Sequence, residues 1–112
     1  MIGRHLILEH WGGVLDRPRV EAAMRDAAAA AEATVLSAHF HPFPGGGVTG
    51  VLLLAESHIT VHTWPEHGYA ALDLFMCGAA EVERAADLLN TALAPERTER
   101  RVIVRGRTTA PT

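Results

Sequence analysis

The sequence predicts an α+β fold in which an antiparallel β-sheet carries two α-helices packed on one face, as a two-layer sandwich. Strand-like segments outnumber helical ones, and the segments between residues 48 and 76 are joined by turns too short for crossover helices. Two other segments repeat apolar residues at helical spacing. The second face of such a sheet needs cover from a ligand or a partner, so we expect a homodimer.

The first half of the chain contains one expected helix between strands. Residues 5–10 form a short apolar-centred segment that ends at Trp11-Gly12-Gly13, as a strand and a turn would. Asp16 suits the N-cap of a helix with Pro18 in its first turn. The apolar face expected for this helix comprises Val20, Met24, Ala27, Ala28 and Ala31. Strands are expected at residues 34–40 and 48–55.

The second half alternates in the same way. Over residues 58–64 the period of two places Ile59 and Val61 on one face, and His58, Thr60 and His62 on the other. Further strands are expected at residues 69–76 and 101–105, the last with arginines that suit a sheet edge. The second helix should bury one face and end before Pro95, and that face comprises Val82, Ala86, Leu89 and Leu93.

Length and composition indicate one globular domain over residues 1–112. The net charge of −3 gives no general attraction for polyanions, so a nucleic-acid partner is not expected. The longest apolar run, at residues 51–55, is too short to cross a membrane, and the first residues do not resemble a signal peptide. A single cysteine, Cys77, excludes an internal disulfide. A cytoplasmic location is therefore expected.

Reactive side chains concentrate between residues 56 and 67, with Cys77 one strand later. From spacing alone they could be a solvated sheet face, or a nucleophilic site built on Ser57 or Cys77. A third hypothesis is a metal-binding domain, because imidazoles suit zinc, iron or copper. Its ligands would be histidine pairs on shared strand faces, namely His39 with His41 and His58 with His62. Periodicity does not decide among these three.

Two motifs favour a specific family. Residues 55–66 read AESHITVHTWPE and residues 68–78 read GYAALDLFMCG. Together with GVTG at residues 47–50 and GRHL at residues 3–6, they resemble the short prokaryotic S-adenosylmethionine decarboxylases over nearly the whole domain. The resemblance implies a proenzyme that cleaves itself between Glu56 and Ser57, giving a β chain of residues 1–56 and an α chain of residues 57–112.

The same resemblance implies the chemistry. Ser57 would become a covalent pyruvoyl group that forms a Schiff base with the substrate amine, so no external cofactor and no metal would be needed. The substrate would be S-adenosylmethionine, and the decarboxylated product would donate aminopropyl groups for spermidine and other polyamines. Relatives with this fold and chemistry act on arginine or ornithine, and these remain alternative substrates.

Further site residues follow from the motif positions. Cys77 would protonate the substrate carbon after loss of CO2, and His62 would transfer a proton during self-cleavage. Phe43 would stack on the adenine and Glu66 would hold the ribose hydroxyls. A hairpin turn is expected at Glu56-Ser57, with the Thr49 hydroxyl placed to bond the developing oxyanion. Because positions 57 and 62 fall on opposite faces of a regular strand, either a bulge near His58 or a turn position for Ser57 is expected.

Overall fold

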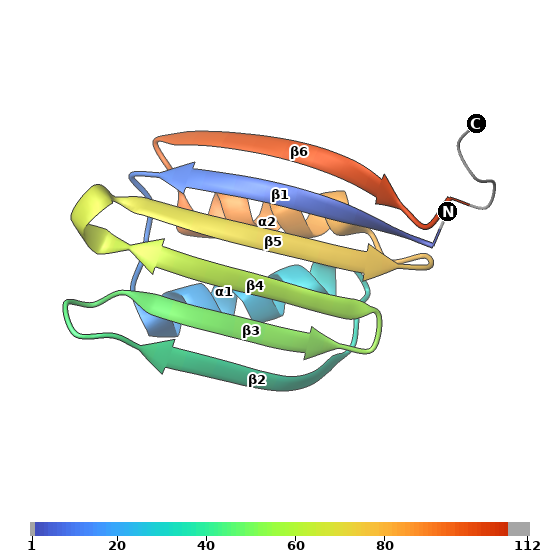
Figure 1. The fold of residues 1–112 in the computed structure, drawn as a ribbon, viewed down its shortest axis with the longest axis horizontal. Helices are drawn as coiled ribbons and strands as arrows, with labels where there is room; N and C mark the ends of the chain where they lie inside the picture. The colour runs from blue at the N-terminus through green and yellow to red at the C-terminus, as the bar shows by residue number, and fades with distance from the viewer. Residues whose placement is uncertain (1, 108–112) are drawn as a thin grey trace.

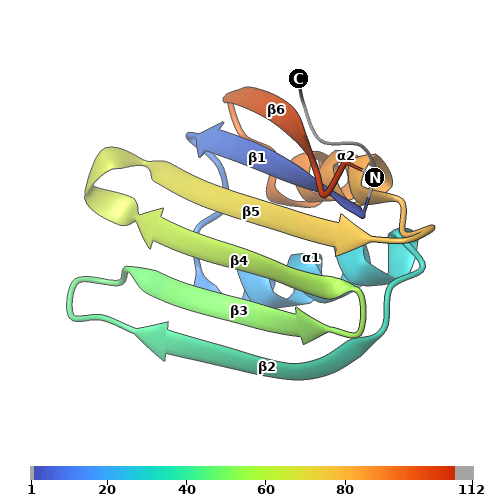
Figure 2. The same ribbon diagram turned by 45° about the vertical axis from the view of Figure 1, so that its right-hand side comes forward.

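The computed structural model describes residues 2–107 and contains one six-stranded sheet with two helices on one of its faces (Figures 1 and 2). All five strand pairings are antiparallel, in the order β2-β3-β4-β5-β1-β6. The predicted α+β class and two-layer arrangement are confirmed. The elements are β1 (Gly3–Trp11), α1 (Arg17–Ala30), β2 (Val35–Pro42), β3 (Val48–Leu54), β4 (Ser57–Trp64), η1 (Pro65–His67), β5 (Tyr69–Cys77), α2 (Val82–Leu93) and β6 (Arg97–Arg105).

The first strand of the chain lies inside the sheet. β1 pairs with β5 on one side and with β6 on the other, so its two neighbours both come from the second half of the chain. β2 and β3 form a hairpin that extends the sheet beyond β4. The two halves of the sequence are thus interleaved in one sheet.

Alternation along the strands separates a buried face from a partly exposed one. In β4, Ile59 and Val61 are fully buried beneath the helices, whereas His58, Thr60 and His62 are only partly buried. The helix faces predicted from the 3.6-residue period are buried against this side of the sheet. Asp16 caps α1 as predicted, because its carboxylate accepts a hydrogen bond from the Arg19 amide at 3.3 Å.

The hairpin between β3 and β4 differs from the prediction. Its turn residues are Ala55 and Glu56, and Ser57 is the first residue of β4, where it pairs with Leu54 and Met76. The register then continues without a shift to His62, so both predicted alternatives, a bulge near His58 and a turn position for Ser57, are wrong. A two-residue turn already closes the hairpin, and an extra residue is not required.

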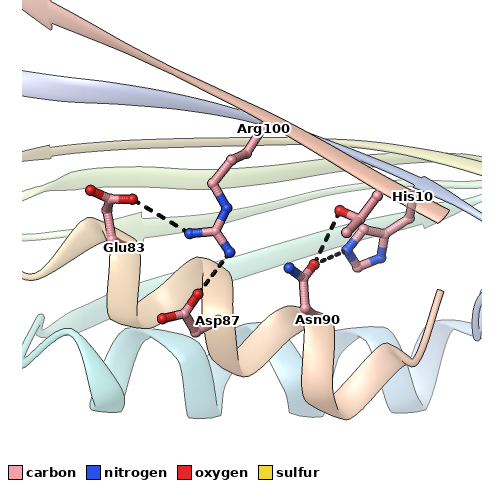
Figure 3. A network of polar contacts seen from close by, with 6 residues as sticks. His10, Glu83, Asp87, Asn90 and Arg100 are labelled. Atoms are coloured by element: carbon pink, nitrogen blue, oxygen red, sulfur yellow. Dashed lines mark hydrogen bonds and ion pairs between the residues drawn. The ribbon is translucent and has the colours of Figure 1, made fainter.

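A polar network joins the covered face of the sheet to α2 (Figure 3). Arg100 of β6 bonds Asp87 at 2.7 Å and Glu83 at 3.5 Å. His10, which is 1% exposed, bonds Asn90 Oδ1 through Nε2 at 2.7 Å. That oxygen can only accept, so Nε2 carries the proton and Nδ1 is left as a buried lone pair without a partner.

Burial lowers the pKa of His10, and the Asn90 hydrogen bond opposes this only in part. The neutral imidazole is therefore the stable form in the fold. Its contribution to stability is complete above the unfolded pKa of about 6.5 and is lost as the pH falls through the lowered folded pKa.

None of the helices in the described residues is long and apolar enough to cross a membrane.

We predict that His10→Leu makes the free energy of unfolding less sensitive to acid. Urea unfolding of both proteins at pH 7.5 and pH 5 checks this, because the remaining histidines are common to both. The loss on acidification should be larger in the wild type, since protonated Nδ1 would be a buried donor without an acceptor. An equal loss in both proteins would show that the fold does not lower the pKa of His10.

Candidate active site

The uncovered face of the sheet carries three of the predicted site residues, Thr49, His62 and Cys77. Both helices lie behind the sheet in the view of Figure 1, and the side chains of alternate strand residues face away from them. His62 of β4 and Cys77 of β5 belong to this partly exposed set. The site residues nevertheless fall into two groups, one at each end of β4.

The first group surrounds the predicted cleavage bond. The backbone amide of Cys77, at the end of β5, donates a hydrogen bond of 3.0 Å to the carbonyl oxygen of Glu56. That carbonyl belongs to the Glu56–Ser57 peptide. A donor on this oxygen polarises the carbonyl and would stabilise negative charge developing on it.

Ser57 has the most unusual backbone of the non-glycine residues. Among residues 2–107, the other two with positive φ, Glu32 and Ala94, lie near the left-handed helical region at 59° and 47°. Ser57 has φ 141°, in a region that side chains rarely adopt. Such a conformation costs about 1–3 kcal/mol and persists only where the surroundings enforce it. The strain therefore lies at the predicted nucleophile itself.

The second group lines a pocket of about 360 Å³ at the other end of β4. Here Thr49 Oγ1 and His62 Nδ1, from directly paired positions of β3 and β4, share a hydrogen bond of 2.9 Å. Phe43, which is 48% exposed, lies in the loop after β2, and Glu66 lies in η1. The pocket thus combines an aromatic ring, a carboxylate and an imidazole, and its lining also includes Pro44, Gly47, Val48, Thr63 and Trp64.

The two groups are far apart within one copy of the chain. Positions 57 and 62 are separated by five residues of regular strand, which span about 16 Å. The expectation that the Thr49 hydroxyl bonds the oxyanion at Glu56 is therefore wrong for a single chain, because Thr49 pairs with His62 instead. By the same register, Ser57 is aligned with the buried row of β4 and His62 with the uncovered row.

Sequence reasoning missed a row of side chains across the uncovered face near this pocket. Arg97, Trp11, Tyr69 and Trp64 occupy successive cross-strand positions from β6 to β4. The Arg97 guanidinium lies 3.9 Å from the centroid of Trp11, and Tyr69 stacks on Trp64 with ring centroids 5.5 Å apart. These residues are distant in sequence, so only the strand register brings them together.

The histidines do not form a metal centre. Within residues 2–107, no three histidine, cysteine, aspartate or glutamate side chains lie close enough together to hold a metal ion. His5 instead bonds the Asp73 carboxylate through Nε2 at 2.9 Å. The metal-binding hypothesis therefore receives no support from the described part of the chain.

Comparisons with known proteins agree with the sequence motifs. The family profile described as S-adenosylmethionine decarboxylase matches residues 4–106. The chain belongs to this family. An S-adenosylmethionine decarboxylase proenzyme of Methanococcus maripaludis strain S2 is 44% identical over 110 residues, covering 94% of this chain and 90% of that protein. The proenzyme of Thermomicrobium roseum is 43% identical over 109 residues, covering 94% of each.

A solved structure supports the same assignment. The crystal structure of the adenosylmethionine decarboxylase from Aquifex aeolicus matches with a TM-score of 0.87 and 36% identity, over 99% of this chain and 96% of that one. The resemblance to short prokaryotic S-adenosylmethionine decarboxylases is thereby confirmed. The family match includes both groups of site residues, from Phe43 to Cys77.

We predict that Tyr69 remains un-ionised well above pH 10. Burial, the hydrogen bond to Glu9 and the negative charges of Glu9 and Asp73 together raise its pKa to about 12, and burial is the largest cause. Tyr69 is the only tyrosine, so the ultraviolet absorbance of its phenolate reports this group alone.

The matched variant is Glu9→Gln, which removes the charge but leaves the burial. Its phenolate should form at a pH below the wild-type value and still above the usual 10, because burial is the largest cause. If Tyr69 of the folded wild type lost its proton near pH 10, its burial and its contact with Glu9 would be contradicted.

Proposed function

We propose that this chain is a self-cleaving, pyruvoyl-dependent decarboxylase of S-adenosylmethionine. The observation that carries the proposal is the Glu56–Ser57 peptide, whose carbonyl accepts a hydrogen bond from Cys77 and whose serine is held at φ 141°. Strain at a nucleophile next to a polarised carbonyl is the arrangement that attack on that carbonyl requires. Membership of a family whose relatives are named proenzymes supports it.

Self-cleavage begins when Ser57 Oγ bonds to the carbonyl carbon of Glu56. The C–N bond breaks, the serine nitrogen gains the hydroxyl proton, and an ester replaces the amide. Removal of the Ser57 Cα proton then expels the Glu56 carboxylate and leaves dehydroalanine. One water replaces its nitrogen, ammonia is released, and the new chain begins with a pyruvoyl carbonyl. The Cys77 amide serves the first step, because the oxygen it contacts becomes the oxyanion.

The two fragments are expected to stay together after cleavage. Residues 1–56 contribute β1, β2, β3 and α1, while residues 57–112 contribute β4, β5, β6 and α2. β1 lies between β5 and β6, so each fragment is hydrogen-bonded within the sheet to the other. Cutting the short turn removes none of these ladders.

The pyruvoyl group would supply an electron sink for the electron pair that stays on the substrate carbon when CO2 leaves. The residues around the cleavage bond fit a pyruvoyl group, because that group arises from Ser57 itself. Ser57 pairs with Met76 of β5, and Cys77 is the next residue along β5. Cys77 is partly buried on the uncovered face, and its thiol would return a proton to the substrate carbon.

The second group supplies the substrate-binding side of the site. Phe43 is an exposed ring able to stack on adenine, and Glu66 is a carboxylate able to accept hydrogen bonds from two ribose hydroxyls. Both line the pocket that contains His62, which we assign to proton transfer during cleavage. These roles favour a nucleoside substrate over arginine or ornithine.

A homodimer would unite the two groups. They lie at opposite ends of β4, and the face between them is not covered by the helices. A two-fold axis between two stacked sheets, running across the strands near the middle of β4, would place the Ser57 end of one chain over the His62 end of the other. Stacked sheets lie about 10 Å apart, which leaves room for a small substrate.

The first test is cleavage itself. Intact-mass measurement of the wild type should give two fragments that separate only on denaturation, the second blocked at its N-terminus. Ser57→Ala should remain one folded, full-length chain, because the attacking oxygen is absent. Ser37→Ala, at the only other serine, is the control and should be cut normally. An uncut wild type, or cleavage of Ser57→Ala at this bond, contradicts the proposal.

The processed protein should then be offered S-adenosylmethionine, arginine and ornithine separately while CO2 release is measured. Only S-adenosylmethionine should be decarboxylated. Cys77→Ala should acquire the pyruvoyl group but turn over about a hundredfold more slowly or worse, because it lacks the proton donor. Release of CO2 from arginine or ornithine alone would reject the substrate and leave the cleavage mechanism intact.

We also predict that cleavage can be restored between two defective chains. Ser57→Ala and His62→Ala, carrying different purification tags, should each fail or be slow alone. In a co-expressed mixed dimer, one site combines the intact Ser57 of the His62→Ala chain with the intact His62 of the Ser57→Ala chain. The His62→Ala chain should therefore be cut at that site. If that chain is cut no faster in mixed dimers than alone, the site does not combine residues of two chains.

A further inference from the structure

We infer that the Glu56 side chain is a positioning residue for self-cleavage, because its bond to the backbone of Thr34 fixes the turn that presents the Glu56–Ser57 peptide to the Cys77 amide. This inference rests on the proposed self-cleavage and adds the loop between α1 and β2 to the machinery that performs it.

Thr34 holds the turn at two points. Its backbone amide donates to Glu56 Oε1 at 2.9 Å, and its carbonyl accepts from the Ala55 amide at 2.9 Å. Both turn residues are therefore attached to one residue of a different segment. The side-chain bond is charge-assisted, which makes it stronger than a bond between neutral groups.

Thr34 is itself anchored to the core helix. The preceding residue, Ala33, donates its amide to the carbonyl of Ala28 at 2.9 Å, and Glu32 donates to Ala29 at 3.0 Å. Ala28 is fully buried beneath the sheet. The chain of contacts therefore runs from a packed helix, through Thr34, to the residue that carries the scissile carbonyl.

The residue types in the turn explain why it needs the two hydrogen bonds to Thr34. Two-residue hairpin turns normally use glycine, asparagine or aspartate, whose backbones accept the required angles, but this one consists of Ala55 and Glu56. Neither of these two residues has a positive φ, and the unusual backbone falls on the next residue, Ser57, at φ 141°. Without an external hold, rotation of the Glu56–Ser57 peptide would relieve the strain and break the Cys77 contact to the carbonyl.

Glu56 is consequently held from two directions. Thr34 binds its side chain on the α1 side, and Cys77 binds its carbonyl from β5. Fixing both ends of one residue orients the peptide plane that lies between it and Ser57. This is the geometry in which the serine oxygen meets the carbonyl carbon while the oxyanion forms against the Cys77 amide.

The test compares Glu56→Ala with Glu56→Gln in the unprocessed full chain, followed by intact-mass measurement over time. Alanine removes the acceptor, so cleavage should slow by about tenfold or more. Glutamine keeps an acceptor oxygen at the same reach and should restore a rate close to that of the wild type. Asp26→Ala, which removes an exposed charge from α1, controls for net charge and should cleave normally.

Hydroxylamine identifies the affected step, because it cuts an ester at Ser57 but not the amide. Glu56→Ala should be resistant to it, since the amide-to-ester shift itself is impaired. A chain halted after that shift would be cut. An ester that accumulates in Glu56→Ala would overturn the inference by placing the defect at the elimination step.

A double-mutant cycle with Thr34→Pro tests the pair, because proline removes the donor amide and keeps the carbonyl that Ala55 uses. Glu56→Ala should add little in that background, and additive effects would overturn the inference. If Thr34→Pro fails to fold, the alanine and glutamine comparison still decides. An uncut wild type rejects the proposed function, whereas equal rates for wild type and Glu56→Ala reject only the role of Glu56.

Discussion

The antiparallel pairing of β4 with β3 and β5 is the constraint on which the rest of this structure depends. Its register runs without a shift from Ser57 to His62, and it decides which side chains face the helices and which face outward. It also sets the separation of about 16 Å between the two groups of site residues. A slip of one residue would turn His62 toward the core and remove it from the pocket.

The two faces of the sheet have different physical tasks. The covered face buries aliphatic side chains against α1 and α2, and its polar groups, such as Arg100 and His10, are bonded to side chains of α2. The uncovered face carries imidazoles, carboxylates, aromatic rings and the thiol. Stability from the first face permits strain at Ser57, whose φ is 141°, next to Glu56, which is held by hydrogen bonds from two neighbouring segments.

The order of strands makes a cut at Glu56–Ser57 compatible with a stable protein. Because β1 lies between β5 and β6, the halves of the chain share one sheet, and the β3–β4 ladder does not need a covalent turn once it is formed. The interleaving also relates the chemistry to the fold. The carbonyl at the end of the first half meets an amide of the second half, at Cys77, only after β4 and β5 have paired.

The sequence by itself determined the fold class and the helix faces, and it predicted which residues are reactive. Helical and strand periodicities depend on local spacing, and the motifs around Ser57 are contiguous in the chain, so both can be read without coordinates. Its predictions differ from the structure where distant segments meet: the turn was placed one residue late, and Thr49 was expected beside the Glu56 carbonyl, whereas within one chain it bonds His62. Only the tertiary structure decided the contacts of Glu56 with Thr34 and Cys77, the row of Trp11, Tyr69 and Trp64, and the division of the site between two ends of a strand. The physical reason is that such contacts follow from strand register and packing, which depend on pairings between residues far apart in sequence.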